Sequence, residues 1–285
     1  MLANVNQSNK TLTIIHQKSY KNKEFPEFKQ IITKFLAEHK SPVKNRLVDA
    51  ACFAVAGPII DQSVKLTNLP WKISAKNLKK ELSLPATLLI NDFSAIGYAI
   101  PHLRDKDQIT LQSAKKQHNA PIAFLGAGTG LGVGLMTPTE KQKYLVLQTE
   151  GGHIDFAPTN TIQQKILAFL SKKYHRVSVE RVLSGHGLAN IYEYLQQDPP
   201  YGIPENPELL HKIETTGSKD PAQIISQYAL EKKDILAQIA LDEFCKIYGA
   251  FCGNIGLSTL CYGGLYIAGG IAPKILPIIQ KSDFI

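Results

Sequence analysis

The sequence predicts an α/β fold built as two domains. Apolar runs typical of strands alternate with stretches whose apolar residues recur every three or four positions, as on one face of a helix. Such alternation is typical of sheets covered by helices. A chain of 285 residues is long enough for two domains of modest size. We expect a small α/β domain over residues 1–103 and a large α/β domain over residues 104–285.

The small domain is expected to begin with a strand and then to alternate. A helix within residues 28–36 is predicted by five apolar residues at helical spacing. Residues 47–56 form an apolar run interrupted only by Asp49, which predicts a strand buried on both faces, as in a parallel sheet. The other expected elements are a strand at 11–19, a helix at 75–82 after the N-cap Ser74, a strand at 87–90 and a helix at 93–99.

The large domain is expected to begin with strands and to continue with helices. The predicted strands are 122–125, 133–136, 144–148 and 264–268, with a glycine-rich turn between the first two. The predicted helices lie within 162–170, 178–183, 188–195 and 224–260, the last with a break near 232–234. A proline-rich loop is expected at 198–207, and Pro273 is expected to open a last helix.

Composition and charge exclude several classes of protein. Hydrophobic residues make up 44% and charged residues 20%, which excludes a disordered, collagen-like or coiled-coil chain. The net charge of +8 is scattered, so we expect a solvated basic surface and no nucleic-acid partner. No apolar stretch is long enough to span a bilayer and no signal peptide is visible, so we expect a cytoplasmic protein without a membrane partner. The four cysteines form no C-x-x-C pair, which favours buried free thiols over a zinc site.

The most glycine-rich segment is Gly126-Ala-Gly-Thr-Gly-Leu-Gly132, between two predicted strands. Its glycines permit close approach of a ligand to the backbone, and successive N–H groups in such a turn can bind an anion. Neither standard nucleotide fingerprint fits, because G-x-G-x-x-G would need glycine at Leu131 and the chain has no G-K-[ST]. The segment is therefore either a loop that contacts phosphate or a flexible hairpin turn.

Asn91 and Asp92 stand at the carboxyl end of the strand predicted at 87–90. Ligands of open α/β sheets bind outside the carboxyl ends of the strands. A carboxylate in that place can accept the proton of a substrate hydroxyl. The alternative role for Asp92 is that of a helix N-cap.

Three further segments carry residues suited to a small ligand. In Glu150-Gly-Gly-His153, the glutamate can accept hydrogen bonds from hydroxyls and the histidine can donate or accept them; the alternative is a turn with a structural histidine. Glu180 is expected on a helix, either buried with Arg181 as a partner or exposed. Residues 267–271 end a strand with paired glycines, which either admit a flat ring or sugar or make a plain strand-to-helix turn.

Taken together and in this order, these segments resemble the bacterial glucokinases of the actin-like sugar kinase superfamily. The matching segments are Ala56-Gly-Pro58, Leu66-Thr-Asn68 with Trp71, Ile90-Asn-Asp-Phe93, Gly126-Ala-Gly-Thr-Gly-Leu-Gly132, Glu150-Gly-Gly-His-Ile-Asp-Phe156, Val179-Glu-Arg-Val-Leu-Ser-Gly185 and Ala268-Gly-Gly-Ile271. They extend from residue 56 to near the end of the chain, and their joint occurrence is very specific. The resemblance implies a two-domain actin-like (ribonuclease H-like) fold with a cleft between the domains.

The resemblance also implies an activity and the residues that perform it. The reaction would transfer the γ-phosphoryl group of ATP, with Mg²⁺, to the 6-hydroxyl of D-glucose, as the first step of glycolysis. Homodimer formation would be compatible with this family. The sugar would be held by Asn91, Asp92, Gly130, Glu150, His153 and Glu180, with Asp92 as the catalytic base. ATP would contact Gly128, Thr129, Gly130 and Gly132 through its phosphates, and Gly269 and Gly270 through its adenosine. The zinc-binding cysteine cluster of related repressor–kinases is absent from the sequence, and no residue is assigned as a metal ligand.

Two departures from the family pattern concern the ends of the chain. Family members begin with an Asp-x-Gly-Gly-Thr-Asn loop that holds the ATP phosphates and magnesium, and no Asp-x-Gly-Gly occurs in this sequence. The sequence also stops at Asp283-Phe-Ile285, before the closing helix of the family. We therefore expect a glucokinase truncated at both ends. The alternative is a non-catalytic sugar-binding or regulatory relative that has lost the first phosphate loop.

Overall fold

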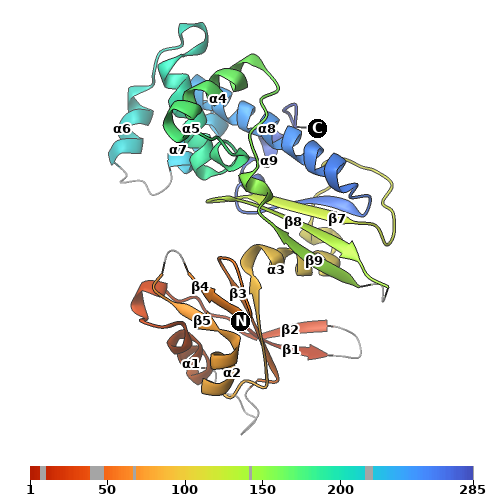
Figure 1. Cartoon of the computed structure of the whole chain (residues 1–285). Coiled ribbons are helices and arrows are strands. Elements are labelled where there is room, and N and C mark those ends of the chain that lie inside the picture. The colour runs from red at the N-terminus through yellow and green to blue at the C-terminus, as the bar shows by residue number, and fades with distance from the viewer. Residues whose placement is uncertain (7–10, 39–47, 67–68, 141–142, 216–220, 285) are drawn as a thin grey trace. The chain divides into compact units, whose positions relative to one another are not determined.

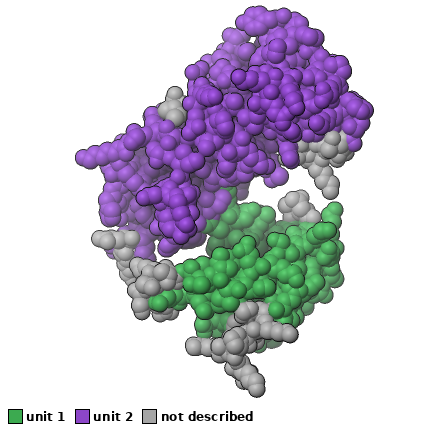
Figure 2. Space-filling model, turned by 180° about the vertical axis from the view of Figure 1, so that it is seen from behind, with its two compact units in different colours: residues 1–95 green, residues 96–285 purple. Residues whose placement is uncertain are grey.

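The computed structural model describes residues 1–6, 11–38, 48–66, 69–140, 143–215 and 221–284. The chain divides into two compact units, Met1–Ala95 (unit 1) and Ile96–Ile285 (unit 2), which Figure 2 shows in different colours. The division falls within helix α3 (Asp92–Ala99), so this helix contributes residues to both units. The domain boundary expected after residue 103 stays a prediction. Two residues of the segment Leu66-Thr-Asn68, at positions 67 and 68, lie outside the described residues.

Unit 1 combines small sheets with helices (Figure 1). Strands β1 (Leu2–Asn6) and β2 (Thr11–His16) form an antiparallel pair, as do β4 (Ser63–Lys65) and β5 (Lys72–Ser74). Strands β3 (Ala50–Val55) and β6 (Ala86–Asn91) pair in parallel. The helical elements are the 3₁₀ turn η1 (Asn22–Glu24), α1 (Phe28–Glu38), α2 (Ala75–Glu81) and the first half of α3.

The core of unit 1 is a small cluster of apolar side chains from its helices and strands. It includes Ile32, Trp71 and Leu89, all of them buried. The ring of Phe28 at the start of α1 lies 5.9 Å from the ring of Trp71 and 5.4 Å from that of Phe53. This packing joins α1 to β3 and explains why the apolar stripe predicted for residues 28–36 forms a helix here.

Strand β3 differs from the expectation that it is buried on both faces. Its residues alternate in exposure, with Cys52 and Ala54 exposed and Val55 buried. Among the described residues, β3 pairs only with β6, so this pair packs one face on the core and leaves the other open. The thiol of Cys52 is consequently exposed, contrary to expectation, whereas Cys245 and Cys252 are buried as expected.

Unit 2 is built on a mixed four-stranded sheet in the order β10-β7-β8-β9 (Figure 1). Strands β7 (Ile122–Ala127), β8 (Leu131–Pro138) and β9 (Tyr144–Thr149) are antiparallel neighbours, and β10 (Gly264–Ala268) pairs with β7 in parallel. The helices are α4 (Thr161–Tyr174), α5 (Gly185–Gln197), α6 (Pro207–Thr215), α7 (Pro221–Leu230), α8 (Ile235–Thr259) and α9 (Ala272–Ile279). Short 3₁₀ turns are η2 (Ile100–His102), η3 (Asp105–Asp107), η4 (Gly151–His153), η5 (Val179–Arg181) and η6 (Pro200–Gly202).

Strand β7 lies at the centre of unit 2, and all six of its residues are buried. Ala123 and Leu125 belong to the large core that the helices form on one side of the sheet. Phe124 points to the opposite face, where a Cβ added to Gly97 of α3 or to Gly134 of β8 would lie 2.7 or 2.1 Å from its Cζ atom. The two glycines therefore allow α3 and β8 to close around the Phe124 ring, and β7 is covered on both faces.

Most of the elements expected in the second half of the chain are confirmed, including the break between α7 and α8 and the last helix, which begins one residue before Pro273. The helix expected at 178–183 is wrong, because only the short turn η5 forms there. The backbone leading into this turn pairs with another segment, since Phe156 N–H donates to Val177 O at 3.0 Å and Val179 N–H to Ile154 O at 2.9 Å. Within the described part of the chain, no helix is both long enough and apolar enough to cross a membrane.

Candidate active site

The end of strand β6 presents Asn91 and Asp92 together. The Asn91 side chain caps α3, because its Oδ1 accepts hydrogen bonds from the N–H groups of Phe93 at 2.9 Å and Ser94 at 3.2 Å. Its Nδ2 donates to the carbonyl of Gly57 at 3.4 Å, in the turn that follows the neighbouring strand β3. Asn91 rather than Asp92 is thus the helix cap.

Asp92 is the first residue of α3 and is exposed. Its Oδ1 accepts a hydrogen bond from Phe93 N–H at 2.9 Å, which fixes the carboxylate at the helix N-terminus. An exposed carboxylate at the carboxyl end of a strand is placed to accept a proton from a bound hydroxyl. The expectation that this pair stands at a strand end is confirmed, and the cap alternative applies to Asn91 instead.

The segment Gly126–Gly132, called the glycine hairpin below, connects β7 to β8. Gly126 pairs with Gly132, and the connecting turn is closed by a hydrogen bond from Gly128 N–H to Gly130 O at 2.8 Å. Thr129 at its tip is exposed. A Cβ on Gly128 would meet nothing within 4 Å, and this residue shows no positive φ, so neither packing nor backbone conformation explains the absence of a side chain there.

Gly130 is explained by a different neighbour. A Cβ at this position would lie 2.7 Å from Oε2 of Glu180, so the glutamate occupies the space that a side chain would need. The same Oε2 accepts a hydrogen bond from Leu131 N–H at 2.8 Å. The partner expected for Glu180, Arg181, instead places its guanidinium 4.2 Å from the ring centre of Tyr174. Glu180 is therefore held by the glycine hairpin and not by an ion pair with Arg181.

Turn η4 brings Glu150 and His153 next to Glu180. The Nε2 of His153 lies 3.8 Å from Oε2 of Glu150, and its Nδ1 lies 4.0 Å from Oε1 of Glu180. Gly152 allows this approach, because a Cβ there would come within 2.1 Å of the carbonyl oxygen of Leu131 on β8. The turn thus sits directly on the strand that leaves the glycine hairpin, and two carboxylates flank one imidazole, a set of groups suited to sugar hydroxyls.

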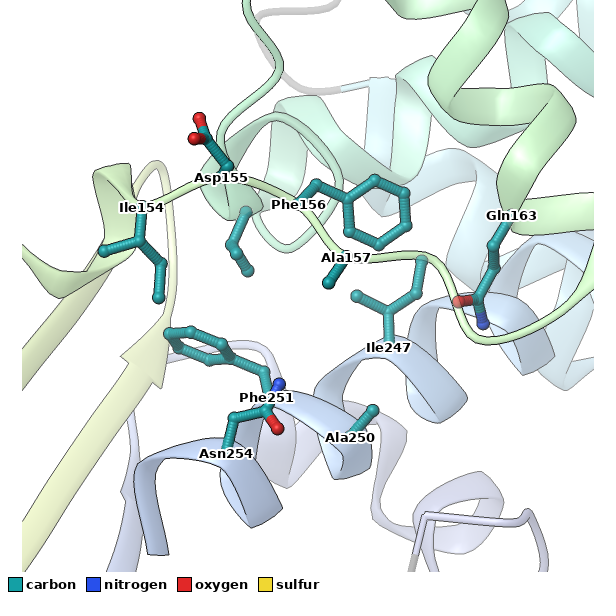
Figure 3. A pocket seen from close by; sticks show the side chains of 10 residues that line it. Ile154, Asp155, Phe156, Ala157, Gln163, Ile247, Ala250, Phe251 and Asn254 are labelled. Atoms are coloured by element: carbon teal, nitrogen blue, oxygen red, sulfur yellow. The ribbon is translucent and has the colours of Figure 1, made fainter. Parts of the chain in front are cut away.

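The segment after η4 is anchored from both sides. Arg176 donates from Nη2 to the carbonyl of His153 at 2.9 Å, and its Nε lies 2.7 Å from Oδ1 of Asp155. Figure 3 shows Asp155 pointing away from a small cavity between this segment and α8, which Phe156 and Phe251 help to line. The cavity is about 30 Å³, enough for a water molecule or two. Turn η4 therefore precedes a segment that packs on α8 over a mostly apolar lining and leaves only a small cavity.

The paired glycines after β10 lie beside the start of the glycine hairpin. Gly269 has φ +84°, and a Cβ there would lie 2.6 Å from the carbonyl oxygen of Ala127. Nothing lies within 4 Å of the Cβ position of Gly270, as at Gly128. The N-terminus of α5 also joins this region, because Gly185 N–H donates to Gly128 O at 2.8 Å. One edge of unit 2 therefore gathers two glycines with open Cβ positions.

Unit 2 brings together most of the residues singled out from the sequence. They are Gly128, Thr129, Gly130, Gly132, Glu150, His153, Glu180, Gly269 and Gly270, whereas Asn91 and Asp92 belong to unit 1. Within the described ranges, no group of three or more His, Cys, Asp or Glu side chains could hold a metal ion. The site therefore supplies backbone amides, carboxylates and an imidazole, but no protein ligand set that we can assign to Mg²⁺.

Sequence reasoning missed the residues that support this site from behind. The buried hydroxyl of Tyr248 on α8 accepts a hydrogen bond from Ala127 N–H at 3.2 Å, just before the glycine hairpin. Ser184 Oγ donates to Glu180 O at 2.8 Å and accepts from Gly187 N–H at 3.0 Å, which caps α5. The serine could have been found as an N-cap before a helical stretch, but Tyr248 lies in an apolar run without a signal.

Comparisons with known proteins point to one family. A family model described as Glucokinase matches residues 1–285. A glucokinase from Nostoc punctiforme is 44% identical over 284 residues, which cover 96% of this chain and 81% of the relative. The crystal structure of a glucokinase from an Antarctic psychrotroph has a TM-score of 0.80 at 30% identity, covering 99% of this chain and 83% of that one.

A ROK family glucokinase from Streptomyces griseus, solved in complex with glucose and AMPPNP, has a TM-score of 0.53 at 19% identity, and the match covers 89% of this chain and 76% of that one. At this identity the match shows a similarity of fold alone. The structural matches confirm the actin-like fold class predicted from the sequence. Because a glucokinase model spans every residue and a glucokinase is 44% identical over nearly the whole chain, the chain belongs to the glucokinase family.

Proposed function

We propose that this chain transfers the γ-phosphoryl group of ATP to the 6-hydroxyl of D-glucose, with Asp92 as the base. Family membership supports ATP-dependent phosphorylation of glucose over the non-catalytic alternative. The observation that carries the residue assignment is that Glu150, His153 and Glu180 meet beside the glycine hairpin within one unit. This arrangement puts hydroxyl-binding groups next to a turn of backbone amides.

The proton step falls to Asp92. The oxygen of the 6-hydroxyl attacks the γ-phosphorus, the bond from that phosphorus to the β,γ-bridging oxygen breaks, and ADP leaves. The hydroxyl proton passes to the Asp92 carboxylate, whose Oδ1 is already oriented by Phe93 N–H. Asn91 holds the start of α3 and is assigned to a sugar hydroxyl as well. Phosphoryl transfer needs little covalent help from the protein, so positioning and charge stabilisation carry the rate.

The sugar and the nucleotide take different parts of the site. The Glu150 and Glu180 carboxylates accept hydrogen bonds from the sugar hydroxyls, and His153 donates or accepts one. The backbone of Gly130 contacts the sugar as well. Residues Gly128 to Gly132 of the glycine hairpin face the phosphates. The open Cβ position of Gly128 supports this assignment, because it leaves room for a ligand next to the backbone. Gly269 and Gly270 face the adenosine, supported in the same way by the open Cβ position of Gly270.

Mg²⁺ is proposed to enter with ATP, as part of the substrate complex. Bound to the phosphates, it would neutralise charge that develops on the transferred group. We also propose that the protein is cytoplasmic and that it performs the first step of glycolysis.

The chain is further proposed to form a homodimer, in which the half-exposed Leu145 and Leu147 on one face of the edge strand β9 are candidate contacts. Sedimentation of the Leu147→Glu variant against the unaltered chain tests the dimer, which the charge should weaken.

Replacing Asp92 by asparagine tests the assignment of the base. Asparagine has nearly the same size and still hydrogen-bonds the 6-hydroxyl, but it cannot take the proton, so turnover should fall by about 10²–10⁴-fold. Glucose affinity, measured by calorimetry, should change little. As a matched control, Glu150→Gln should weaken glucose binding instead, because a sugar hydroxyl loses its charged acceptor. If Asp92→Asn keeps more than about a tenth of the turnover, Asp92 is not the base.

A further inference from the structure

We propose that the Glu180 carboxylate is a strut that couples the sugar site to the glycine hairpin, so that glucose raises the affinity for nucleotide. The inference rests on the proposed function, in which Glu180 binds sugar and the hairpin binds phosphate. It adds a role for one side chain that belongs to both sites at once. The two oxygen atoms of the Glu180 carboxylate contact different parts of the site.

One oxygen of the carboxylate belongs to the hairpin. Oε2 accepts the N–H of Leu131 at 2.8 Å, and it lies only 2.7 Å from where a Cβ of Gly130 would be. A hydrogen bond from a backbone N–H to a charged acceptor is among the stronger ones in proteins. The hairpin turn therefore rests against Glu180, and the glycine at position 130 is what makes the contact sterically feasible.

The other oxygen faces the sugar-binding turn. Oε1 lies 4.0 Å from Nδ1 of His153, and the Glu180 side chain is 29% exposed, so a ligand can reach it. His153 is in turn 3.8 Å from the Glu150 carboxylate. A sugar hydroxyl that donates to Oε1 would fix the carboxylate in the rotamer that also serves the hairpin.

The backbone that carries Glu180 is fixed, which leaves the side chain as the adjustable part. Ser184 Oγ donates to the Glu180 carbonyl at 2.8 Å, and the preceding residue, Val179, donates its N–H to Ile154 O at 2.9 Å. When sugar holds the carboxylate in place, the hairpin keeps its anchor without further loss of side-chain freedom. By linkage, bound nucleotide must raise glucose affinity by the same factor.

The first test measures nucleotide binding in the absence of sugar. Calorimetry with AMPPNP and Mg²⁺ should show about tenfold weaker binding in Glu180→Ala, because Leu131 N–H loses a charged acceptor. Simple electrostatics predicts the opposite sign, since removing a negative charge beside a phosphate site favours an anion. Glu180→Gln can still accept the N–H through its amide oxygen, in a weaker hydrogen bond, and should lose less affinity for AMPPNP than Glu180→Ala. Equal or tighter AMPPNP binding by Glu180→Ala overturns the strut.

The second test measures glucose binding in the absence of nucleotide. Gly130→Ala places a Cβ 2.7 Å from Oε2 and must displace the Glu180 side chain, so glucose affinity should fall although the substitution keeps the backbone N–H and C=O groups of Gly130. Gly253→Ala on α8 is the matched control, because its Cβ meets nothing within 4 Å and glucose affinity should not change. The strut is overturned if both variants bind glucose like the unaltered chain.

The two tests separate this inference from the proposed function. If Glu180→Ala loses glucose binding but keeps its AMPPNP affinity, the sugar role stands and the coupling is wrong. If Glu180→Ala binds glucose normally, the sugar assignment itself fails. Far-UV circular dichroism and melting confirm that each variant is folded. Should the alanine variant unfold, Glu180→Gln takes its place. Glucose should then raise its AMPPNP affinity by a smaller factor than in the unaltered chain, because a neutral amide holds the hairpin and the sugar hydroxyl more weakly, and an equal factor overturns the coupling.

Discussion

Replacing Gly152 by alanine should cost glucose affinity through geometry alone. A Cβ at this position would lie 2.1 Å from the carbonyl oxygen of Leu131 and 3.0 Å from its Cβ. Real Cβ atoms essentially never approach another heavy atom within 3.0 Å, so turn η4 must move away from β8 by roughly the missing 0.9 Å. The carbonyl oxygen and the Cβ of Leu131 are both fixed to the backbone, so no side chain can rotate to relieve the clash.

The displacement carries His153 with it, because the histidine is the next residue of the same turn. Overpacking of this kind costs about 1–3 kcal/mol, and misplacing a binding group by about 1 Å can cost about 10²-fold in rate. We expect a tenfold or greater loss of glucose affinity, about 1.4 kcal/mol or more. Calorimetry with D-glucose measures the affinity, and thermal unfolding measures the stability of the same sample.

Gly253→Ala is the control for introducing a methyl group elsewhere in unit 2. Gly253 is an exposed residue within α8, and a Cβ there meets nothing within 4 Å. Alanine in a helix interior is favoured over glycine by about 0.5–1 kcal/mol, so this variant should be slightly more stable and should bind glucose normally. A folded Gly152→Ala protein with unchanged glucose affinity would refute the claim that η4 is pressed against β8.

Three further predictions concern residues that support the site or the fold. Tyr248→Phe leaves the buried Ala127 N–H without its acceptor, so we expect a loss of about 1–3 kcal/mol in the free energy of unfolding, measured by urea titration; no loss would mean that water replaces the hydroxyl. Arg176→Ala removes the hydrogen bond to the carbonyl group of His153 at the end of η4, so steady-state kinetics should show a raised KM for glucose with kcat nearly unchanged. A fall in kcat with an unchanged KM would contradict a role of Arg176 in positioning the sugar-binding turn. Hydrogen bonds from the Tyr194 hydroxyl and from Lys165 lower the pKa of Asp198 below its ordinary value of 3.8. The ionised carboxylate therefore stabilises the fold at pH values above 3.8, and this effect is lost as the pH falls through the lowered pKa. Tyr194→Phe should lower the melting temperature more at neutral pH than well below pH 3.8, and an equal loss at both pH values would count against the ion–hydroxyl pair.

The periodic elements could be predicted from the sequence because their patterns are local. The stripe that begins at Phe28 forms α1, and the break between α7 and α8 falls where Asp234 caps the second helix. The prediction of a helix at 178–183 was wrong because tertiary contacts decide the structure of this segment. Its apolar residues face a core on one side while its backbone pairs with Ile154 and Phe156, and periodicity cannot reveal a pairing partner more than twenty residues away.

The candidate site was predictable as a set of residues but not as a set of contacts. Glycine spacing and the order of the polar segments singled out Gly130, Glu150 and Glu180 from the chain alone. The sequence suggested Arg181 as the partner of Glu180, whereas the structure provides a backbone N–H. A backbone donor leaves no mark in the sequence, so contacts of this kind emerge only once the strands and turns are placed.

Identifying the phosphorylated product by ³¹P nuclear magnetic resonance tests the central claim most directly. The chain is incubated with D-glucose, ATP and Mg²⁺, and the spectrum is followed with time. Glucose 6-phosphate and ADP should appear in equal amounts, and 6-deoxyglucose, which lacks the accepting hydroxyl, should yield no sugar phosphate. An ATP signal that stays unchanged, or that is converted to ADP and inorganic phosphate without a sugar phosphate, would contradict the transfer of the γ-phosphoryl group to the 6-hydroxyl.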